Sequence, residues 1–258
     1  ERPFDSLFRQ LKQDQELLAQ SAQECQQSNT ELENFAYIAS HDMQEPLRKV
    51  VSFMQLLQKR YASQLDKKAN EFIDIAIDGG TRMRQMISDL LEYSRVGTRG
   101  NPFVQADLEV ILNEVLSDLV LLIEENGATI THDPLPSLVV DPIQMHQLFL
   151  NLLTNALKFR KEESPVVHIS AIAQGNNYLF SVQDNGIGID MTQADRLFQL
   201  FQRLHGRGDY PGTGIGLAVC KKIVERHGGQ IWVESELEKE TTFYFTLPQS
   251  HIEVPKRE

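Results

Sequence analysis

Residues 212–229 read GTGIGLAVCKKIVERHGG, and this stretch decides the fold of the C-terminal part of the chain. Three glycines, Gly212, Gly214 and Gly216, open a segment whose apolar spacing predicts a helix over Ile215 to Arg226. Bare backbone N–H groups at such a helix start form a seat for an anion. The glycine spacing does not fit a dinucleotide fingerprint, and the chain contains no Gly-Lys dipeptide for a Walker-type loop. We therefore expect a phosphate site of another design, although a plain loop would also explain the glycines.

A polar line precedes this stretch on a second predicted helix, which begins after Pro142. The segment NLLTNALKF places Asn151, Asn155 and Lys158 at i, i+4 and i+7, on one helix face. Two amides and an ammonium group can serve a metal ion and a phosphate. The alternative is a polar stripe that merely faces water.

Alternating apolar residues predict strands around the segment DNGIG. One strand carries Val167 to Ala171, and the next carries Phe180 to Gln183 and ends at Asp184. Gly186 and Gly188 follow, where a backbone must turn sharply or approach a flat ligand closely. Further elements complete the pattern: a helix near Leu108 to Glu124, an extended segment at Ala128 to Thr131, and closing strands at Ile231 to Val233 and Thr242 to Leu247. Helices interleaved with hairpin-connected strands predict an α+β fold, an α/β sandwich with helices on one face of a mixed sheet.

The N-terminal part of the chain is helical in character. Apolar residues recur from Ala36 to Tyr61 and from Leu65 to Leu90 at spacings of three and four, which predicts two amphipathic helices in an antiparallel hairpin. Each apolar stripe is too broad for one partner helix. We therefore expect two hairpins to form a dimeric four-helix bundle. Before it, residues with a seven-residue repeat, including Cys25, predict a weak coiled coil, for which a solvated helical spacer is the alternative.

These patterns divide the chain into five parts. They are a coiled-coil helix at 1–31, a helical-hairpin dimerisation domain at 32–96, a linker at 97–103, an α+β domain at 104–248 and a tail at 249–258. The linker is the point where Gly97 to Pro102 break the helical pattern.

His41 is the residue of the first hairpin helix with nucleophilic potential. It lies about 200° round the helix from the nearest stripe positions, and so faces water in the predicted helix. An exposed imidazole is mostly neutral at pH 7 and carries a free lone pair. Asp42 beside it can accept a proton or hold the other ring N–H, and Pro46 should loosen the helix one turn beyond. By position alone, however, a surface histidine is ordinary.

Composition limits the class of protein. The 258 residues carry a formal charge of −11, which repels a phosphate backbone and argues against nucleic acid as a partner. The two cysteines share no close spacing with each other or with histidines, so neither a disulfide framework nor a zinc site is expected. No apolar run approaches the roughly 18 residues of a membrane span. We expect a cytoplasmic fragment of a longer sensor protein, without membrane contact of its own.

Together, the motifs resemble the catalytic half of the sensor histidine kinases of two-component systems. The residues around His41 are similar to those of phytochrome-linked and PAS-linked members. The segment SHDMQEPL looks like the phosphoacceptor box, which implies catalytic roles for His41 and Asp42. NLLTNALKF resembles the asparagine box, which implies Asn155 as a ligand of Mg²⁺, with Asn151 as its helper and Lys158 as a phosphate contact.

The glycine and phenylalanine motifs extend this resemblance. DNGIG matches the first glycine box and implies that Asp184 binds the adenine amine, beside Gly186 and Gly188. LFQLFQR resembles the phenylalanine box, in which Phe198 and Phe201 would anchor an ATP lid that runs to about Tyr210. The second glycine box would bind ATP through Gly212, Thr213, Gly214, Gly216 and Leu217.

The resemblance implies a homodimeric autokinase that phosphorylates His41 from Mg-ATP and passes the phosphoryl group to an aspartate of a response regulator receiver domain. It also implies a signalling role for the helix at 1–31, histidine phosphotransfer by the hairpin domain at 32–96, and ATP binding and catalysis by the domain at 104–248. Two departures stand out. Glu238, Lys239 and Glu240 replace the third glycine box, where we expect a different hairpin turn. Glu45 stands where members with strong phosphatase activity often carry Thr or Asn.

Two other functions stay open at this stage. One is an ATP-driven conformational clamp, since the resemblance implies the same nucleotide fold in certain chaperones and topoisomerases. The other is a non-catalytic dimeric signalling scaffold with a vestigial nucleotide site. The stimulus, the receiver, and phosphorylation within a subunit or between subunits do not follow from the sequence.

Overall fold

The computed structural model describes residues 40, 42–98, 100–203 and 212–249, together with scattered positions between 12 and 27. The coiled-coil register with Cys25, the acceptor His41, the lid from 204 to Tyr210 and most of the tail lie outside these residues. The predictions for them therefore stay predictions.

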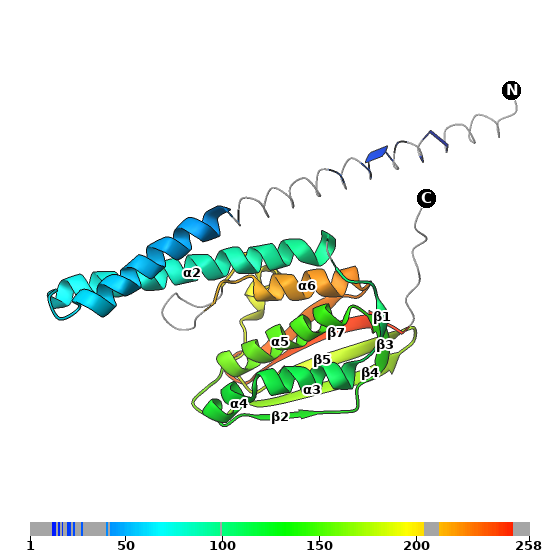
Figure 1. The fold of residues 1–258 in the computed structure, drawn as a ribbon. Coiled ribbons are helices and arrows are strands. Elements are labelled where there is room, and N and C mark those ends of the chain that lie inside the picture. Colours follow the sequence, from blue (N-terminus) through cyan, green and yellow to red (C-terminus); the bar gives the residue numbers. More distant parts are fainter. Residues whose placement is uncertain are drawn as a thin grey trace, which may run out of the picture.

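The helical hairpin forms as predicted. A helix over 42–61 ends in a turn at 62–65, and α2 (Lys67–Thr98) returns antiparallel to it (Figure 1). Asp66 caps α2, because its carboxylate accepts a 2.7 Å hydrogen bond from the backbone N–H of Ala69. The Asn70 amide ties the turn together by donating to the carbonyl oxygens of Ala62 and Leu65, at 3.0 and 3.3 Å.

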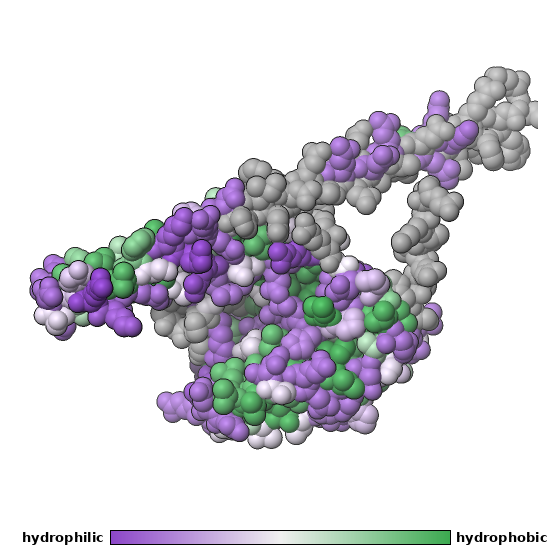
Figure 2. Space-filling view, viewed as in Figure 1, coloured by the Kyte–Doolittle hydropathy of each residue, from purple (hydrophilic) through white to green (hydrophobic). Residues whose placement is uncertain are grey.

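The two hairpin helices approach closely at Gly80. A Cβ added there would lie 2.4 Å from Cγ2 of Val51, which is buried. Other large apolar side chains of the hairpin stay exposed in the single chain, and Figure 2 shows a hydrophobic surface along its outer part. These exposed side chains include Met43, Val50, Phe53, Leu57, Phe72, Ile75 and Met83. This unfilled face is what a bundle of two hairpins would bury.

The C-terminal domain contains a five-stranded sheet in the order β2 (Thr129–His132), β4 (Val166–Gln174), β5 (Asn177–Asp184), β7 (Glu240–Pro248) and β6 (Ile231–Glu236). β2 is parallel to β4 and the other pairs are antiparallel, which confirms the predicted mixed sheet. Three helices cover one face of it (Figure 1): α3 (Leu108–Asp118), α5 (Pro142–Lys158) and α6 (Gly216–Arg226). A short 3₁₀ helix, η1 (Met191–Arg196), follows β5.

Two details differ from the sequence prediction. The single helix expected near Leu108 to Glu124 is two helices, α3 and α4 (Val120–Asn126), which meet at the buried Leu119 with φ −92° and ψ 2°. In addition, β1 (Val104–Asp107) pairs antiparallel with β3 (Ser137–Val140), and neither strand was predicted. Both strands have only four residues, too few to show a clear alternation.

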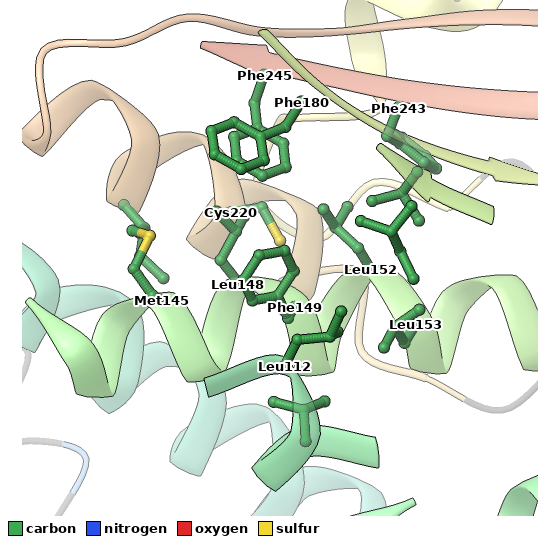
Figure 3. Packing of buried hydrophobic residues seen from close by; sticks show 14 of the residues in the cluster. Leu112, Met145, Leu148, Phe149, Leu152, Leu153, Phe180, Cys220, Phe243 and Phe245 are labelled. Atoms are coloured by element: carbon green, nitrogen blue, oxygen red, sulfur yellow. The ribbon is translucent and has the colours of Figure 1, made fainter. Parts of the chain in front are cut away.

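The core lies between the helical layer and the sheet (Figure 3). Phe180 of β5 and Phe245 of β7 stack with their ring centroids 4.7 Å apart, and Phe149 of α5 meets the Phe245 ring edge-on. Cys220 of α6 points into the same cluster and is fully buried. Because α5 and α6 are packed rigidly on the sheet, the polar residues on their other faces are held in place.

Candidate nucleotide site

A pocket of about 360 Å³ lies where α5, α6 and the loop after β5 meet, beside α2. The pocket brings together ten of the residues predicted from the sequence. They are Asn151, Asn155, Lys158, Asp184, Gly188, Gly212, Thr213, Gly214, Gly216 and Leu217. Three segments that are far apart in the chain therefore supply one cavity, as a single ligand site requires.

Asp184 is a buried carboxylate that lines the pocket. It is the last residue of β5 and is 7% exposed, and one carboxylate oxygen accepts a 2.8 Å hydrogen bond from the N–H of Gly186. Burial is the main cause that raises the pKa of Asp184, to about 6, against the lowering effect of that hydrogen bond. Thr241 of β7 is paired with Asp184 in the sheet and also lines the pocket. This part of the pocket therefore contains a buried hydrogen-bond acceptor, the Asp184 carboxylate.

The polar residues of α5, Asn151, Asn155 and Lys158, line the pocket. The Asn151 amide donates to the carbonyl oxygen of Gly216 at 3.4 Å, which joins α5 to the first turn of α6. The pKa of Lys158 is lowered to about 8, by burial first and by the positive charge of Arg203 second. A partly desolvated ammonium that faces a cavity gains from an anionic partner.

The loop before α6 lines the pocket beside Lys158. Gly212 and Gly214 have φ of 147° and 76°, in the region that favours glycine. A Cβ on Gly212 would lie 2.7 Å from Nζ of Lys158, so the loop backbone passes directly beside the ammonium group. A Cβ on Gly214 would lie 2.6 Å from the carbonyl oxygen of Gln202. Gly214 is thus required by a close backbone contact as well as by its positive φ, and Gly212 by its positive φ.

Among the residues predicted to bind ATP, three do not line the cavity, and neither does Asp42, which is exposed on the first hairpin helix. Gly186 packs under it, where a Cβ would lie 2.3 Å from the carbonyl oxygen of Phe159. Phe198 contacts Phe243 edge-on, with the ring centroids 6.4 Å apart, and so anchors the segment after η1 to the sheet. Phe201 is 52% exposed and has φ of 62°, unusual for a bulky residue. Gly186, Phe198 and Phe201 therefore support the structure around the pocket and do not line it.

A different turn replaces the third glycine box. Glu238 takes a positive φ of 59°, and the N–H of Lys239 closes the turn on the carbonyl oxygen of Glu236 at 3.0 Å. The turn also touches the first glycine box, because a Cβ on Gly188 would lie 2.2 Å from the carbonyl oxygen of Glu236. The hairpin expected at this departure from the family pattern is present.

The donor set suits a metal ion that arrives with a phosphate ligand. The part of the chain that the structure describes has no group of three or more His, Cys, Asp or Glu side chains that could hold a metal by themselves. The Asn155 amide lines the pocket and has no hydrogen-bond partner among the described residues. Mg²⁺ is commonly held by one or two protein oxygens plus phosphates and water, so Asn155 fits such an ion.

Sequence reasoning missed the contribution of α2. Gln85, Asp89 and Glu92 line the same pocket, at i, i+4 and i+7 on one face of that helix. The Thr213 hydroxyl donates to the Asp89 carboxylate at 2.5 Å. Only this spacing could have indicated the face, and a solvated polar stripe has the same pattern.

Family comparisons agree with both domains. Residues 140–251 match the family model of histidine kinase-, DNA gyrase B- and HSP90-like ATPases. Residues 31–99 match the His kinase A (phospho-acceptor) domain, which includes His41 and Asp42. Among the described residues, no helix is long and apolar enough to cross a membrane.

Individual relatives point the same way. The chain is 52% identical over 240 residues to "Cyanobacterial phytochrome A" of Nostoc sp., which covers 93% of this chain and 31% of that protein. It is 41% identical over 235 residues to "Cyanobacterial phytochrome B" of the same organism, covering 89% of this chain and 31% of that protein. The chain thus spans about a third of the length of these curated relatives.

A solved structure, that of full-length ShkA in complex with AMPPNP, aligns with a TM-score of 0.63 at 26% identity, over 83% of this chain and 45% of that one. The histidine kinase AdeS of Acinetobacter baumannii aligns with a TM-score of 0.57 at 19% identity, over 79% of this chain and 97% of that one. The latter likeness concerns the fold alone.

Proposed function

Because the chain belongs to the sensor histidine kinases, as their phosphoacceptor and ATPase core, we propose that it phosphorylates its own His41 from Mg-ATP bound in the pocket described above. The family's chemistry is histidine autophosphorylation and phosphotransfer in two-component signalling, and its phosphoacceptor domain generally implies a homodimer and a response regulator partner. The observation that carries the proposal is the convergence of Asp184, the α5 polar line and the loop before α6 on one cavity.

Two groups of lining residues differ in chemistry, and this supports one orientation of the nucleotide. Asp184 is a buried hydrogen-bond acceptor that suits the adenine amine. Lys158 and the backbone N–H groups before α6 suit the phosphates, since both are positive or partly positive groups and they lie side by side. The Asn155 amide oxygen would hold Mg²⁺, which supplies charge neutralisation to the phosphoryl group when bound.

Autophosphorylation then needs a neutral imidazole in line with the γ-phosphorus. One ring nitrogen of His41 would form the new N–P bond while the bond to the bridging β,γ oxygen of ATP breaks and ADP leaves. Asp42 would orient the ring by accepting its other N–H, which leaves the attacking lone pair free. Transfer to a receiver aspartate of a response regulator would complete the cycle, in the cytoplasm if the parent sensor keeps this part there.

The test is incubation of the full chain with Mg²⁺ and ATP labelled at the γ-phosphate. The expected result is label on the protein that is stable to alkali and lost in acid, as a phosphohistidine is. Asn155→Asp should weaken Mg-ATP binding by altering the ligand charge and its hydrogen bonding. The control Asn113→Asp changes an exposed amide of α3, outside the pocket, and should behave as the parent. Nucleotide binding without any label would instead favour the conformational clamp, and no nucleotide binding at all would favour the scaffold.

A further inference from the structure

We infer that α2 acts as a competitor of the nucleotide phosphates, with Asp89 and Glu92 occupying the part of the pocket proposed for the phosphates until Mg-ATP displaces them. The inference deepens the proposed function and rests on it, since it concerns the regulation of the same site. It assigns to α2 a role beyond dimerisation.

The position of Asp89 is the first observation. One of its carboxylate oxygens accepts the 2.5 Å hydrogen bond from the hydroxyl of Thr213, in the middle of the glycine loop. The other accepts a 2.7 Å hydrogen bond from the Gln85 amide, one turn earlier on α2. With both oxygens held, the carboxylate is fixed against the loop whose neighbouring backbone passes Lys158.

The charge of this face is the second observation. Glu92 also lines the pocket, and the pKa of its carboxyl is raised by burial first and by the negative charge of Asp89 second. Two neighbouring carboxylates in a partly desolvated cavity repel each other, and they would repel a triphosphate more strongly. A carboxylate accepts hydrogen bonds from the same donors as a pair of phosphate oxygens. The α2 carboxylates and the nucleotide phosphates would therefore compete for the same donor groups.

The packing of α2 on the ATPase domain is the third observation. In Figure 1, α2 lies beside α6, and Lys222 of α6 places its ammonium 4.4 Å from the ring centroid of Tyr93. Further along, the Gln144 amide donates to the carbonyl oxygen of Val96 at 3.1 Å. Val96 is also buried in the hydrophobic core of that domain, and Leu90 and Tyr93 pack against it. Displacement of the two carboxylates by a nucleotide therefore requires α2 to shift relative to α6, against apolar as well as polar contacts.

The competition predicts how affinity depends on the number of phosphates. Asp89→Asn keeps the shape of the side chain and an acceptor for Thr213 but removes the charge. We expect it to tighten Mg-ATP binding about fivefold, ADP binding less, and adenosine binding not at all. Asp78→Asn is the matched control, because Asp78 is an exposed carboxylate of the same helix, paired with Arg82 at 2.7 Å and outside the pocket.

A tether tests the movement of α2 directly. Tyr93→Cys and Lys222→Cys, in a Cys25→Ser background, would be joined by a short bifunctional thiol reagent, because the parent side chains already touch. The joined protein should bind Mg-ATP at least several-fold more weakly than the same protein left unjoined, with adenosine binding equal in both.

The outcomes separate the two proposals. Equal Mg-ATP affinity in Asp89→Asn and the parent, or equal affinity with and without the tether, overturns the competition while leaving the kinase proposal intact. Tightening that is the same for adenosine and ATP also overturns it, since the effect would not come from phosphate charge. Absence of nucleotide binding in the parent and in every variant instead refutes the proposed function, and the competition with it.

Discussion

The backbone N–H of Glu238 donates a 2.6 Å hydrogen bond to the carbonyl oxygen of Ile187. This bond joins the β6–β7 turn, where the family's third glycine box is absent, to the middle of the first glycine box. Ile187 also receives support from the other side, because its N–H donates to the carbonyl oxygen of Phe159 at 3.0 Å. The loop that follows Asp184 is therefore held between the end of α5 and a hairpin turn.

The Glu238–Ile187 bond leads to the first prediction. Glu238→Pro removes the donor and cannot adopt the positive φ, so Mg-ATP affinity should fall, by about three- to tenfold if one such bond is lost. Glu238→Gly keeps the N–H and suits the turn, so its affinity should equal that of the parent. Isothermal titration calorimetry with Mg-ATP measures both variants. Equal affinity of the proline variant and the parent would show that the turn does not support the loop.

Asp184→Asn should act in opposite directions on binding and on stability. Burial raises the folded-state pKa of Asp184 to about 6, above the ordinary value of 3.8. The folded protein is therefore stabilised when Asp184 is protonated. This contribution to the free energy of unfolding is fully present below pH 3.8 and is lost as the pH rises through about 6. At pH 7.5 the buried carboxylate therefore destabilises the protein. Its removal should raise the free energy of unfolding by about 1–3 kcal/mol.

The same variant should bind ATP more weakly, because an amide can accept only through its oxygen and its NH₂ group would face the adenine amine. Urea unfolding of the nucleotide-free protein and titration with Mg-ATP measure the two effects separately. Asp133→Asn, which changes an exposed carboxylate near His168, is the control. A variant that loses both stability and binding would contradict the assignment of Asp184 as a strained, functional carboxylate.

The pH dependence of nucleotide binding should show two limbs. Protonation of Asp184 as the pH falls through about 6 removes the charged acceptor, and deprotonation of Lys158 as the pH rises through about 8 removes the cation. Affinity should therefore be highest between these values. Lys158→Arg should abolish the loss at alkaline pH, because a guanidinium stays protonated. The dissociation constant of Mg-ADP would be followed from pH 5 to 9, and an alkaline limb that persists in the arginine variant would exclude Lys158 as its cause.

His41→Gln should abolish phosphorylation of the protein and leave Mg-ATP affinity nearly unchanged, because the acceptor and the nucleotide belong to different domains. His168→Gln on the sheet is the matched control, since His168 lies outside the pocket and pairs with Thr131 at 2.9 Å. Filter-bound label from γ-labelled ATP gives the first quantity, and calorimetry gives the second. Acid-labile label on His41→Gln at the level of the parent would refute His41 as the acceptor.

Glu45→Thr and Glu45→Asn should increase phosphatase activity toward the phosphorylated receiver. A neutral hydroxyl or amide can orient a water molecule toward phosphorus, whereas the carboxylate of Glu45 repels the incoming phosphate. Glu45 is exposed and forms an ion pair with Lys49 at 2.7 Å, which moderates this repulsion. Lys49→Gln, which leaves the Glu45 charge without that pair, should lower the activity further. The measurement is the decay of labelled receiver with ADP present, and equal decay rates in all variants would show that Glu45 does not control it.

The sequence by itself determined most of the helices and strands and the residues that line the candidate site. Apolar spacing of three and four residues gave the hairpin and α5, and period-two alternation gave β4 and β5, because burial on one face imposes those periods. The polar residues that line the pocket stood out as exceptions to the same patterns, as Asn155 and Lys158 do on α5. The short strands β1 and β3 and the break at Leu119 did not stand out, because four residues or one bend leave too little pattern to detect.

Only the tertiary structure decided which separate segments meet. That Asp89 of α2 contacts Thr213 before α6 depends on how the hairpin packs on the ATPase domain, across 124 positions of sequence. Likewise, the bond from Glu238 to Ile187 depends on the sheet order, which brings the β6–β7 turn beside the end of β5. Local periodicity reports whether a residue faces water or a core, but it carries no record of which distant residue lies opposite. Contacts between elements arise from the packing of whole surfaces, and the sequence of either element alone does not contain them.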